Sequence, residues 1–186
     1  SRNTLLTLLR MGTVPIINEN DTVVFEQIRF GDNDTLAALV AGLVDADLLI
    51  LLSDIEGLFT GNPRTDNEAR MIRIVEEITP EIERLAGEPG SKLGSGGMVT
   101  KIQAAKIACN LGVPMVLANG SRENVLRDIL AEMNVGTLFV PKSHRLKARK
   151  GWIAYGSEPV GNIIVDAGAE KALVENGKSL LPSGIL

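Results

Sequence analysis

The stretch from Gly94 to Lys101, GSGGMVTK, constrains the fold more than any other part of the chain. Three of its first four residues are glycine, and a glycine inside a helix costs about 1 kcal/mol relative to alanine. The glycines therefore cannot form a helix interior. The residues from Val99 to Leu111 carry apolar side chains at helical spacing, which predicts a helix that begins just after the glycines.

A glycine-rich turn that leads into a helix is a suitable place for a bound anion. The first N–H groups of the helix have no acceptor, and the small side chains let a phosphate approach the backbone. Lys101 lies in the predicted first turn and adds a positive charge there. The stretch is not a Walker A loop, because Thr100 precedes the lysine where that motif has a glycine. A glycine-rich surface loop before an ordinary helix is the alternative that these residues leave open.

Composition limits the classes of protein that this chain can represent. It has 186 residues, of which 45% are hydrophobic and 23% charged, with a formal net charge of −4. These values predict a globular protein and argue against a strongly basic nucleic-acid-binding surface. The single cysteine, Cys109, indicates a reducing compartment, so we expect a cytoplasmic protein. No apolar run is long enough to span a membrane.

Polar residues follow two predicted strands. The aliphatic run Leu48–Leu52 is typical of a central parallel strand, and Ser53 and Asp54 come directly after it. The β-branched run Val14–Ile17 predicts a second buried strand, followed by the NEND sequence of Asn18–Asp21. Open α/β sheets place their ligands at the carboxyl ends of strands, which favours a binding role, although NEND could also be a simple turn.

The sequence GDNDT, Gly31–Thr35, predicts the start of a helix whose apolar residues recur at helical spacing. One of Asp32, Asn33 and Asp34 would suffice as its N-cap. Because the cluster holds more polar groups than a cap needs, we favour a functional role for it. Other predicted elements are a helix over Arg2–Met11, a hairpin or lid over Thr22–Phe30, interrupted helical segments over Ile72–Leu85, a strand over Met115–Leu117, a helix over Val125–Met133 and a strand over Thr137–Val140. Strands that alternate with helices predict a doubly wound α/β fold with a mainly parallel sheet.

Four elements in this order, INEND, GDNDT, LLSDIEGLFT and LGSGGMVTKIQAA, closely resemble the glutamate 5-kinases of the amino acid kinase family. The downstream segments VDAGAEKAL and GKSLLPSGI look like the start of the PUA domain that follows many of these kinases. The resemblance implies a kinase domain without its N-terminal part over residues 1–145, a basic linker over 146–158 and the beginning of a truncated, β-rich PUA-like domain over 159–186. The chain starts at Ser1 and ends at SLLPSGIL, so we expect a fragment at both ends.

The resemblance also implies a reaction and its partners. The family transfers the γ-phosphoryl group of ATP, with Mg²⁺, to the side-chain carboxylate of L-glutamate, which is the first step of proline biosynthesis. Proline is the implied feedback inhibitor, and a homo-oligomer is expected. Family members begin with a strand that carries another catalytic lysine, and this strand is missing here. We therefore expect residues 1–186 alone to be inactive or nearly so.

Individual residues receive roles by the same resemblance. Asp34 matches the aspartate that orients the catalytic lysines, and Lys101 matches the catalytic lysine of the ATP-binding glycine segment. The implied glutamate-binding residues are Asn18, Asp21 and Asn33. The implied ATP-binding residues are Ser53, Asp54, Ser95, Gly96, Gly97, Met98, Val99, Thr100 and Lys101. No residue is assigned to a metal.

Two other functions remain as alternatives. A related amino acid kinase could act on another carboxylate or on a nucleotide and share the ATP segment. Alternatively, the basic residues Arg145–Lys150 and the PUA-like segment could bind RNA. The acidic net charge of the chain argues against RNA binding.

Overall fold

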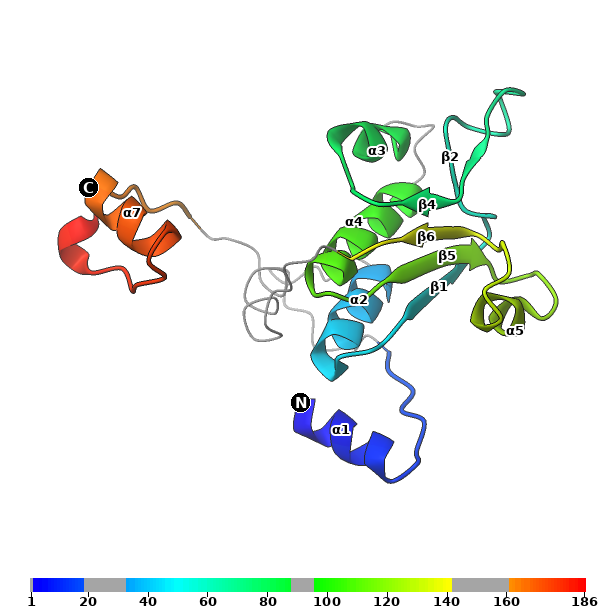
Figure 1. Ribbon diagram of the computed structural model, residues 1–186, viewed down its shortest axis with the longest axis horizontal. Helices are drawn as coiled ribbons and strands as arrows, with labels where there is room; N and C mark the ends of the chain where they lie inside the picture. The colour runs from blue at the N-terminus through cyan, green and yellow to red at the C-terminus, as the bar shows by residue number, and fades with distance from the viewer. Residues whose placement is uncertain (1, 19–32, 88–95, 142–160) are drawn as a thin grey trace.

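The computed structural model describes residues 2–18, 33–87, 96–141 and 161–186 (Figure 1). Their helices and strands, in chain order, are α1 (Arg2–Arg10), α2 (Asn33–Val44), β1 (Leu49–Ser53), β2 (Leu58–Phe59), β3 (Met71–Ile72), β4 (Ile74–Val75), α3 (Pro80–Leu85), α4 (Gly96–Asn110), β5 (Met115–Asn119), α5 (Val125–Leu130), β6 (Thr137–Phe139), α7 (Ala167–Val174) and the short 3₁₀ helix η2 (Pro182–Gly184). No helix of the described residues is long and apolar enough to cross a membrane.

The main sheet has four strands in the order β1-β5-β6-β4. Strands β1 and β5 run parallel, with Leu49 opposite Met115 and Ser53 opposite Asn119. Strands β4 and β6 are also parallel to each other, whereas β5 and β6 are antiparallel. A separate antiparallel pair is formed by β2 and β3. The carboxyl ends of β1 and β5 therefore lie at one edge of the sheet, and the carboxyl end of β4 lies at the opposite edge.

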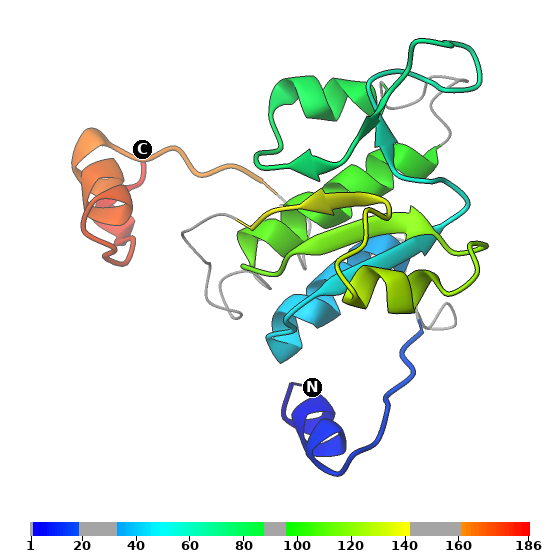
Figure 2. The same cartoon turned by 45° about the vertical axis from the view of Figure 1, so that its right-hand side comes forward.

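Helices cover both faces of this sheet, as a doubly wound fold requires. Figure 2 shows α2 and α4 behind the sheet and α5 in front of it. The larger core lies under α2 and α4 and includes Leu51, Leu117 and Phe139. The smaller core lies under α5 and joins Val116 to Ile129. The predicted α/β class with a mainly parallel sheet is confirmed.

Small residues let α2 and α4 pack closely together. The buried small residues are Ala38, Ala41 and Gly42 on α2 and Ala104, Ala105 and Ala108 on α4. A methyl group added at Gly42 would overlap the Leu111 side chain, which begins the turn after α4. Since helix axes approach only as closely as the side chains between them allow, these small residues permit the close packing, and Gly42 leaves room for Leu111 at the end of α4.

Several predicted elements differ from the structure. The run Val14–Ile17 is not a buried strand: it is irregular, and Ile16 is 95% exposed. No strand of the described residues lies beside this run, so within that part of the chain it has no sheet to join. The segment predicted as interrupted helix begins instead with β3 and β4, and α3 starts only at Pro80, where Thr79 caps it.

Two further predictions misplace the ends of helices. Helix α4 begins at Gly96 rather than Val99, because glycines are tolerated in the first turn of a helix even though they are costly in its interior. Helix α5 ends at Leu130, which is short of the predicted end at Met133. The predicted hairpin over Thr22–Phe30 lies outside the described residues.

The C-terminal residues 161–186 contain α7, which Asp166 caps by accepting a 2.8 Å hydrogen bond from the Ala169 N–H. Val165 and Ile185 form an isolated antiparallel bridge. The domain boundaries and the assignment to a PUA-like domain stay predictions.

The close contact at Gly42 generates a stability prediction. Glycine-to-alanine replacement inside a helix normally stabilises a protein by about 1 kcal/mol. We expect Gly42→Ala to destabilise the protein instead, by about 1–3 kcal/mol, because the new methyl group overlaps Leu111. Denaturant unfolding measures the change. Adding Leu111→Ala should then cost less than it does in the wild-type background, because the cavity it leaves accommodates the new methyl group. A stabilising Gly42→Ala would contradict this account of the helix contact.

Candidate active site

The first turn of α2 is joined through one carboxylate to the second turn of α4, where Lys101 lies because this helix begins at Gly96 and not at Val99 as predicted. Asp34 lies in the first turn of α2, and its Oδ2 accepts hydrogen bonds from the Lys101 ammonium at 3.1 Å and from the Thr100 hydroxyl at 2.9 Å. The side chains of Lys101 and Asp34 are only 12% and 19% exposed. This ion pair is therefore shielded from water and holds the lysine in a defined position.

The Thr100 hydroxyl has a second partner within α4. Its oxygen lies 2.9 Å from the carbonyl oxygen of Gly97, so Asp34 and this carbonyl share one donor hydrogen. The hydroxyl is thus occupied by protein acceptors. It links the glycine end of α4 to the carboxylate of α2.

Both helix N-termini lie at the edge of the sheet where β1 and β5 end. A short connection returns each helix antiparallel to the strand after it: α2 leads into β1, and α4 leads into β5. The N-termini, whose first N–H groups have no acceptor within the helix itself, therefore lie beside the carboxyl ends of these strands. The partial positive charges of the two helix ends and the Lys101 ammonium make this edge suited to binding an anion.

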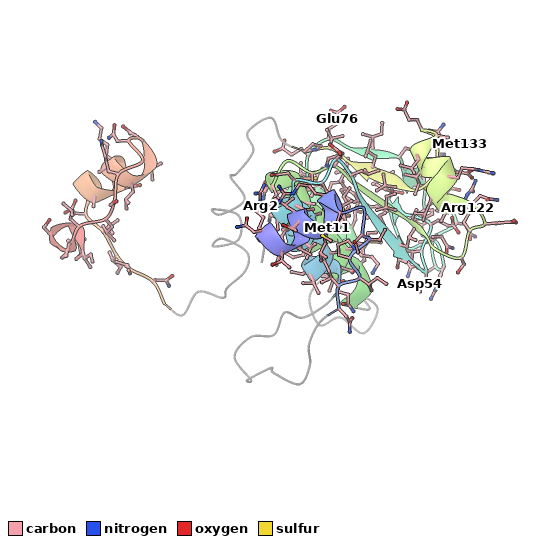
Figure 3. All side chains as sticks on the ribbon, turned by 90° about the horizontal axis from the view of Figure 1, so that it is seen from below. Arg2, Met11, Asp54, Glu76, Arg122 and Met133 are labelled. Carbon is pink, nitrogen blue, oxygen red and sulfur yellow. The ribbon has the colours of Figure 1, made fainter. Side chains whose placement is uncertain are left out.

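The residues after β1 form a polar turn at the same edge. The Ser53 hydroxyl donates a 3.0 Å hydrogen bond to Asp54 Oδ1. The Gly120 N–H donates to the Ser53 carbonyl at 2.8 Å, and the Asn119 side-chain amide donates to Glu56 Oε1 at 2.7 Å. These two bonds join the loop after β1 to the turn after β5. Asp54 itself remains exposed (Figure 3).

For the other residues assigned by resemblance, the structure gives a position in an element or no description. Gly96, Gly97, Met98 and Val99 form the start of α4, and the side chains of Met98 and Val99 pack against the core. Asn33 is the exposed first residue of α2, and Asn18 is exposed in the irregular segment after α1. Asp21 and Ser95 lie outside the described residues. The structure therefore brings together Asp34, Thr100 and Lys101 and, at the same sheet edge, Ser53 and Asp54.

Glu56 and Asn119 received no role from the sequence. The signal that links them is the parallel pairing of β1 with β5 in register, which brings their following loops together.

Two further observations concern preformed metal clusters and reactive thiols among the described residues. These residues contain no group of three or more His, Cys, Asp or Glu side chains that could hold a metal ion. Cys109 is buried in α4, and desolvation raises the pKa of its thiol from 9.0 to about 11. The thiol is therefore protonated near neutral pH, which suits a core residue and not a nucleophile.

These features define a doubly wound α/β protein with a candidate anion site at the sheet edge where two helix N-termini and two strand ends meet. Residues 1–119 match the Amino acid kinase family, and the chain belongs to that family.

The chain is similar to bacterial proteins named glutamate 5-kinase. It is 56% identical over 186 residues to the protein of Moorella thermoacetica, covering 100% of this chain and 49% of that protein. It is also 56% identical over 183 residues to the protein of Caldanaerobacter subterraneus, covering 98% of this chain and 49% of that protein. The chain thus spans about half the length of the curated relatives it matches.

Solved structures support the fold at lower sequence identity. UMP kinase from Bacillus anthracis aligns with a TM-score of 0.57 at 18% identity, covering 77% of this chain and 52% of that one. An isopentenyl phosphate kinase aligns with a TM-score of 0.53 at 20% identity, covering 75% of this chain and 51% of that one. These likenesses concern the fold alone.

The shielded ion pair makes a testable contribution to stability. Asp34→Asn removes the charge that balances the Lys101 ammonium, and we expect it to lower the free energy of unfolding by about 1–3 kcal/mol. Adding Lys101→Met to Asp34→Asn should recover part of this loss, because the unbalanced charge is removed. Denaturant unfolding of the two single variants and the double variant measures the coupling. Additive effects of the two changes would show that the pair does not interact.

Proposed function

We propose that the protein carrying this chain is a glutamate kinase, which transfers the γ-phosphoryl group of ATP to the side-chain carboxylate of L-glutamate in the first step of proline biosynthesis. The observation that carries the proposal is the Asp34–Thr100–Lys101 cluster at the glycine-containing start of α4. The 56% identity to proteins named glutamate 5-kinase, across the entire chain, supports glutamate as the acceptor.

The proposed reaction needs little acid–base chemistry. A carboxylate oxygen of glutamate attacks the γ-phosphorus, and the bond from that phosphorus to the β,γ-bridging oxygen breaks. ADP leaves with the electron pair of this bond, and the product is an acyl phosphate. Because the nucleophile is already ionised, catalysis depends on alignment of the two substrates and on stabilising the charge of the transferring group.

Each residue of the cluster has a role that its contacts support. Lys101 supplies a compact positive charge beside the transferring phosphoryl group, and Asp34 with Thr100 holds it in place. The first N–H groups of α4 bind phosphate oxygens. Ser53 and Asp54, at the carboxyl end of β1, contact the nucleotide. Asp21 and Asn33, with Asn18, bind glutamate.

The described residues fit a Mg²⁺ ion that arrives with the nucleotide. Mg²⁺ keeps several waters and is commonly held by substrate phosphates with one or two carboxylates, so it needs no preformed cluster of protein ligands. The described residues hold no such cluster, and Asp54 offers an exposed carboxylate at the same edge. When bound, Mg²⁺ neutralises phosphate charge.

Three further proposals accompany this function: proline acts as a feedback inhibitor at the glutamate site, the protein assembles as a homo-oligomer, and it resides in the cytoplasm. A nucleotide or another acid as phosphoryl acceptor is the alternative that the fold permits, since structures of UMP kinase and isopentenyl phosphate kinase share it. RNA binding is not proposed.

A substrate comparison tests the proposed function. In the full-length protein, ADP release with Mg-ATP should be far faster with glutamate than with aspartate, N-acetylglutamate or UMP, because the acceptor site aligns only the correct carboxylate. Proline should raise the apparent KM for glutamate. A coupled ADP-release assay with equal concentrations of each acceptor measures the preference. Preference for any acceptor other than glutamate would overturn the proposal.

Replacing Lys101 separates binding from chemistry. Loss of one preorganised electrostatic donor typically lowers kcat on the order of 10²–10³-fold, so Lys101→Ala should show a loss of this size with a much smaller change in the KM for ATP. Lys101→Arg should restore activity only in part, because a planar guanidinium does not replace a compact ammonium. Steady-state kinetics of the full-length protein measure both constants.

Lys106→Ala is the matched control for this experiment. Lys106 lies on the same helix, is exposed and pairs with Glu83 at 2.6 Å, away from Asp34. Its replacement should leave kcat within about twofold, as expected for an exposed surface pair. Near-normal kcat in Lys101→Ala would mean that Lys101 is not part of the catalytic machinery.

A further inference from the structure

Hydrogen bonds attach the loop after β1 to other parts of the chain at three points. The loop begins at Ser53, whose carbonyl accepts from the Gly120 N–H at 2.8 Å. It ends at Leu58, whose N–H donates to the buried Thr137 hydroxyl at 2.8 Å. Between these points, the Glu56 carboxylate accepts from Asn119 at 2.7 Å. The loop is therefore attached at its start, its middle and its end.

The Asn119 side chain is well placed for this attachment because both ends of its amide are used. Its Nδ2 donates to Glu56, while its Oδ1 accepts from the Ser121 N–H at 2.9 Å. The second bond fixes the orientation of the amide, so its donor group faces Glu56. Gly120 packs against Leu52, where an added methyl group would lie only 3.2 Å from Leu52 Cβ. The turn after β5 is thus a close support for the loop after β1.

We propose that Glu56 and Asn119 are positioning residues for nucleotide binding: their hydrogen bond fixes the loop that presents Ser53 and Asp54. The inference rests on the proposed role of Ser53 and Asp54 as nucleotide contacts. A loop that is already ordered pays less conformational entropy when a ligand binds, so the pair should strengthen binding without touching the ligand. The effect should appear in ATP affinity and not in the acceptor site.

The test exchanges the hydrogen-bond donor and acceptor of the Asn119–Glu56 pair in the full-length protein. Asn119→Asp keeps the acceptor for Ser121 but replaces the donor to Glu56 with a second carboxylate. We expect this variant to weaken ATP binding about 3- to 10-fold, the range set by loss of one hydrogen bond. Adding Glu56→Gln supplies a new amide donor facing the new carboxylate. This double variant should recover most of the lost affinity.

Three measurements distinguish positioning from a general structural role. Calorimetric titration with a non-hydrolysable ATP analogue gives affinity without depending on phosphoryl transfer. Steady-state kinetics should show a raised KM for ATP with nearly unchanged kcat and unchanged KM for glutamate. Unfolding of the nucleotide-free variants should change little, because the hydrogen bond is exposed.

Glu76→Ala provides the matched control. Glu76 is an exposed carboxylate directly after β4, whose carboxyl end lies at the opposite edge of the sheet from that of β5. Figure 3 shows Glu76 well separated from Asp54. Its removal lowers the negative charge by the same amount as Glu56→Gln and should leave the affinity for the ATP analogue unchanged.

The outcomes separate this inference from the proposed function. A wild-type protein that phosphorylates glutamate, combined with unchanged analogue affinity in Asn119→Asp, would overturn the positioning role alone. Loss of affinity that Glu56→Gln fails to restore would also overturn it, since the effect would then not act through this pair. A wild-type protein that binds the analogue but does not phosphorylate glutamate would overturn the acceptor assignment and leave the positioning test intact.

Discussion

The geometry of the candidate active site depends on the hydrogen bonds that the carboxylate of Asp34 accepts. This carboxylate is the shared acceptor for Lys101 and Thr100, and through these two hydrogen bonds it links the first turn of α2 to the second turn of α4. Its position depends in turn on how closely the two helices pack. Close packing is permitted in the core by Gly42 and the buried alanines of the two helices. The geometry of the surface edge therefore depends on small residues that lie within about two helical turns of Asp34.

The topology of the sheet explains why the polar residues gather on one side. Strands β1 and β5 run in the same direction, so the loops after them emerge together. Strand β6 runs the other way and begins at this edge with Thr137, which accepts from Leu58 and donates to the Ile72 carbonyl at 2.6 Å. One buried hydroxyl thus ties the β2–β3 pair to the main sheet, and its polar atom is fully satisfied. The candidate site and the Thr137 hydroxyl that joins the two sheets therefore lie at the same edge.

Local sequence patterns predicted the elements in which the apolar side chains themselves form a continuous run or a helical face. The aliphatic run of β1 and the helical spacing of α2 and α4 are examples, and the fold class followed from their alternation. Val14–Ile17 had the same β-branched character, yet it forms no strand, because strand formation also depends on a neighbour that no local pattern reveals. The starting point of α4 was misplaced for another reason: helix propensity describes interiors, whereas Gly96 and Gly97 occupy the first turn.

The sequence could identify the residues of the candidate site that belong to recognisable motifs, but not the contacts between them. Lys101 and Asp34 could be singled out from their motifs, but the sequence does not state that one oxygen of Asp34 accepts from both Lys101 and Thr100. The Glu56–Asn119 contact joins residues 63 positions apart and required the register of β1 with β5. Contacts of this kind depend on strand pairing, which a single sequence specifies only through the complete fold.

The contacts of Asp34 also bear on what it can do chemically. To act as a base, it would have to accept a proton on a carboxylate that already receives hydrogen bonds from an ammonium and a hydroxyl. Protonation would weaken both bonds and leave the shielded Lys101 charge unbalanced. Lysine, by contrast, has three donor hydrogens and can keep its bond to Asp34 while another hydrogen faces a phosphate oxygen. The arrangement is therefore suited to holding a charge in place while a phosphoryl group moves past it. In the proposed reaction, Asp34 organises that charge, and the acceptor carboxylate needs no base.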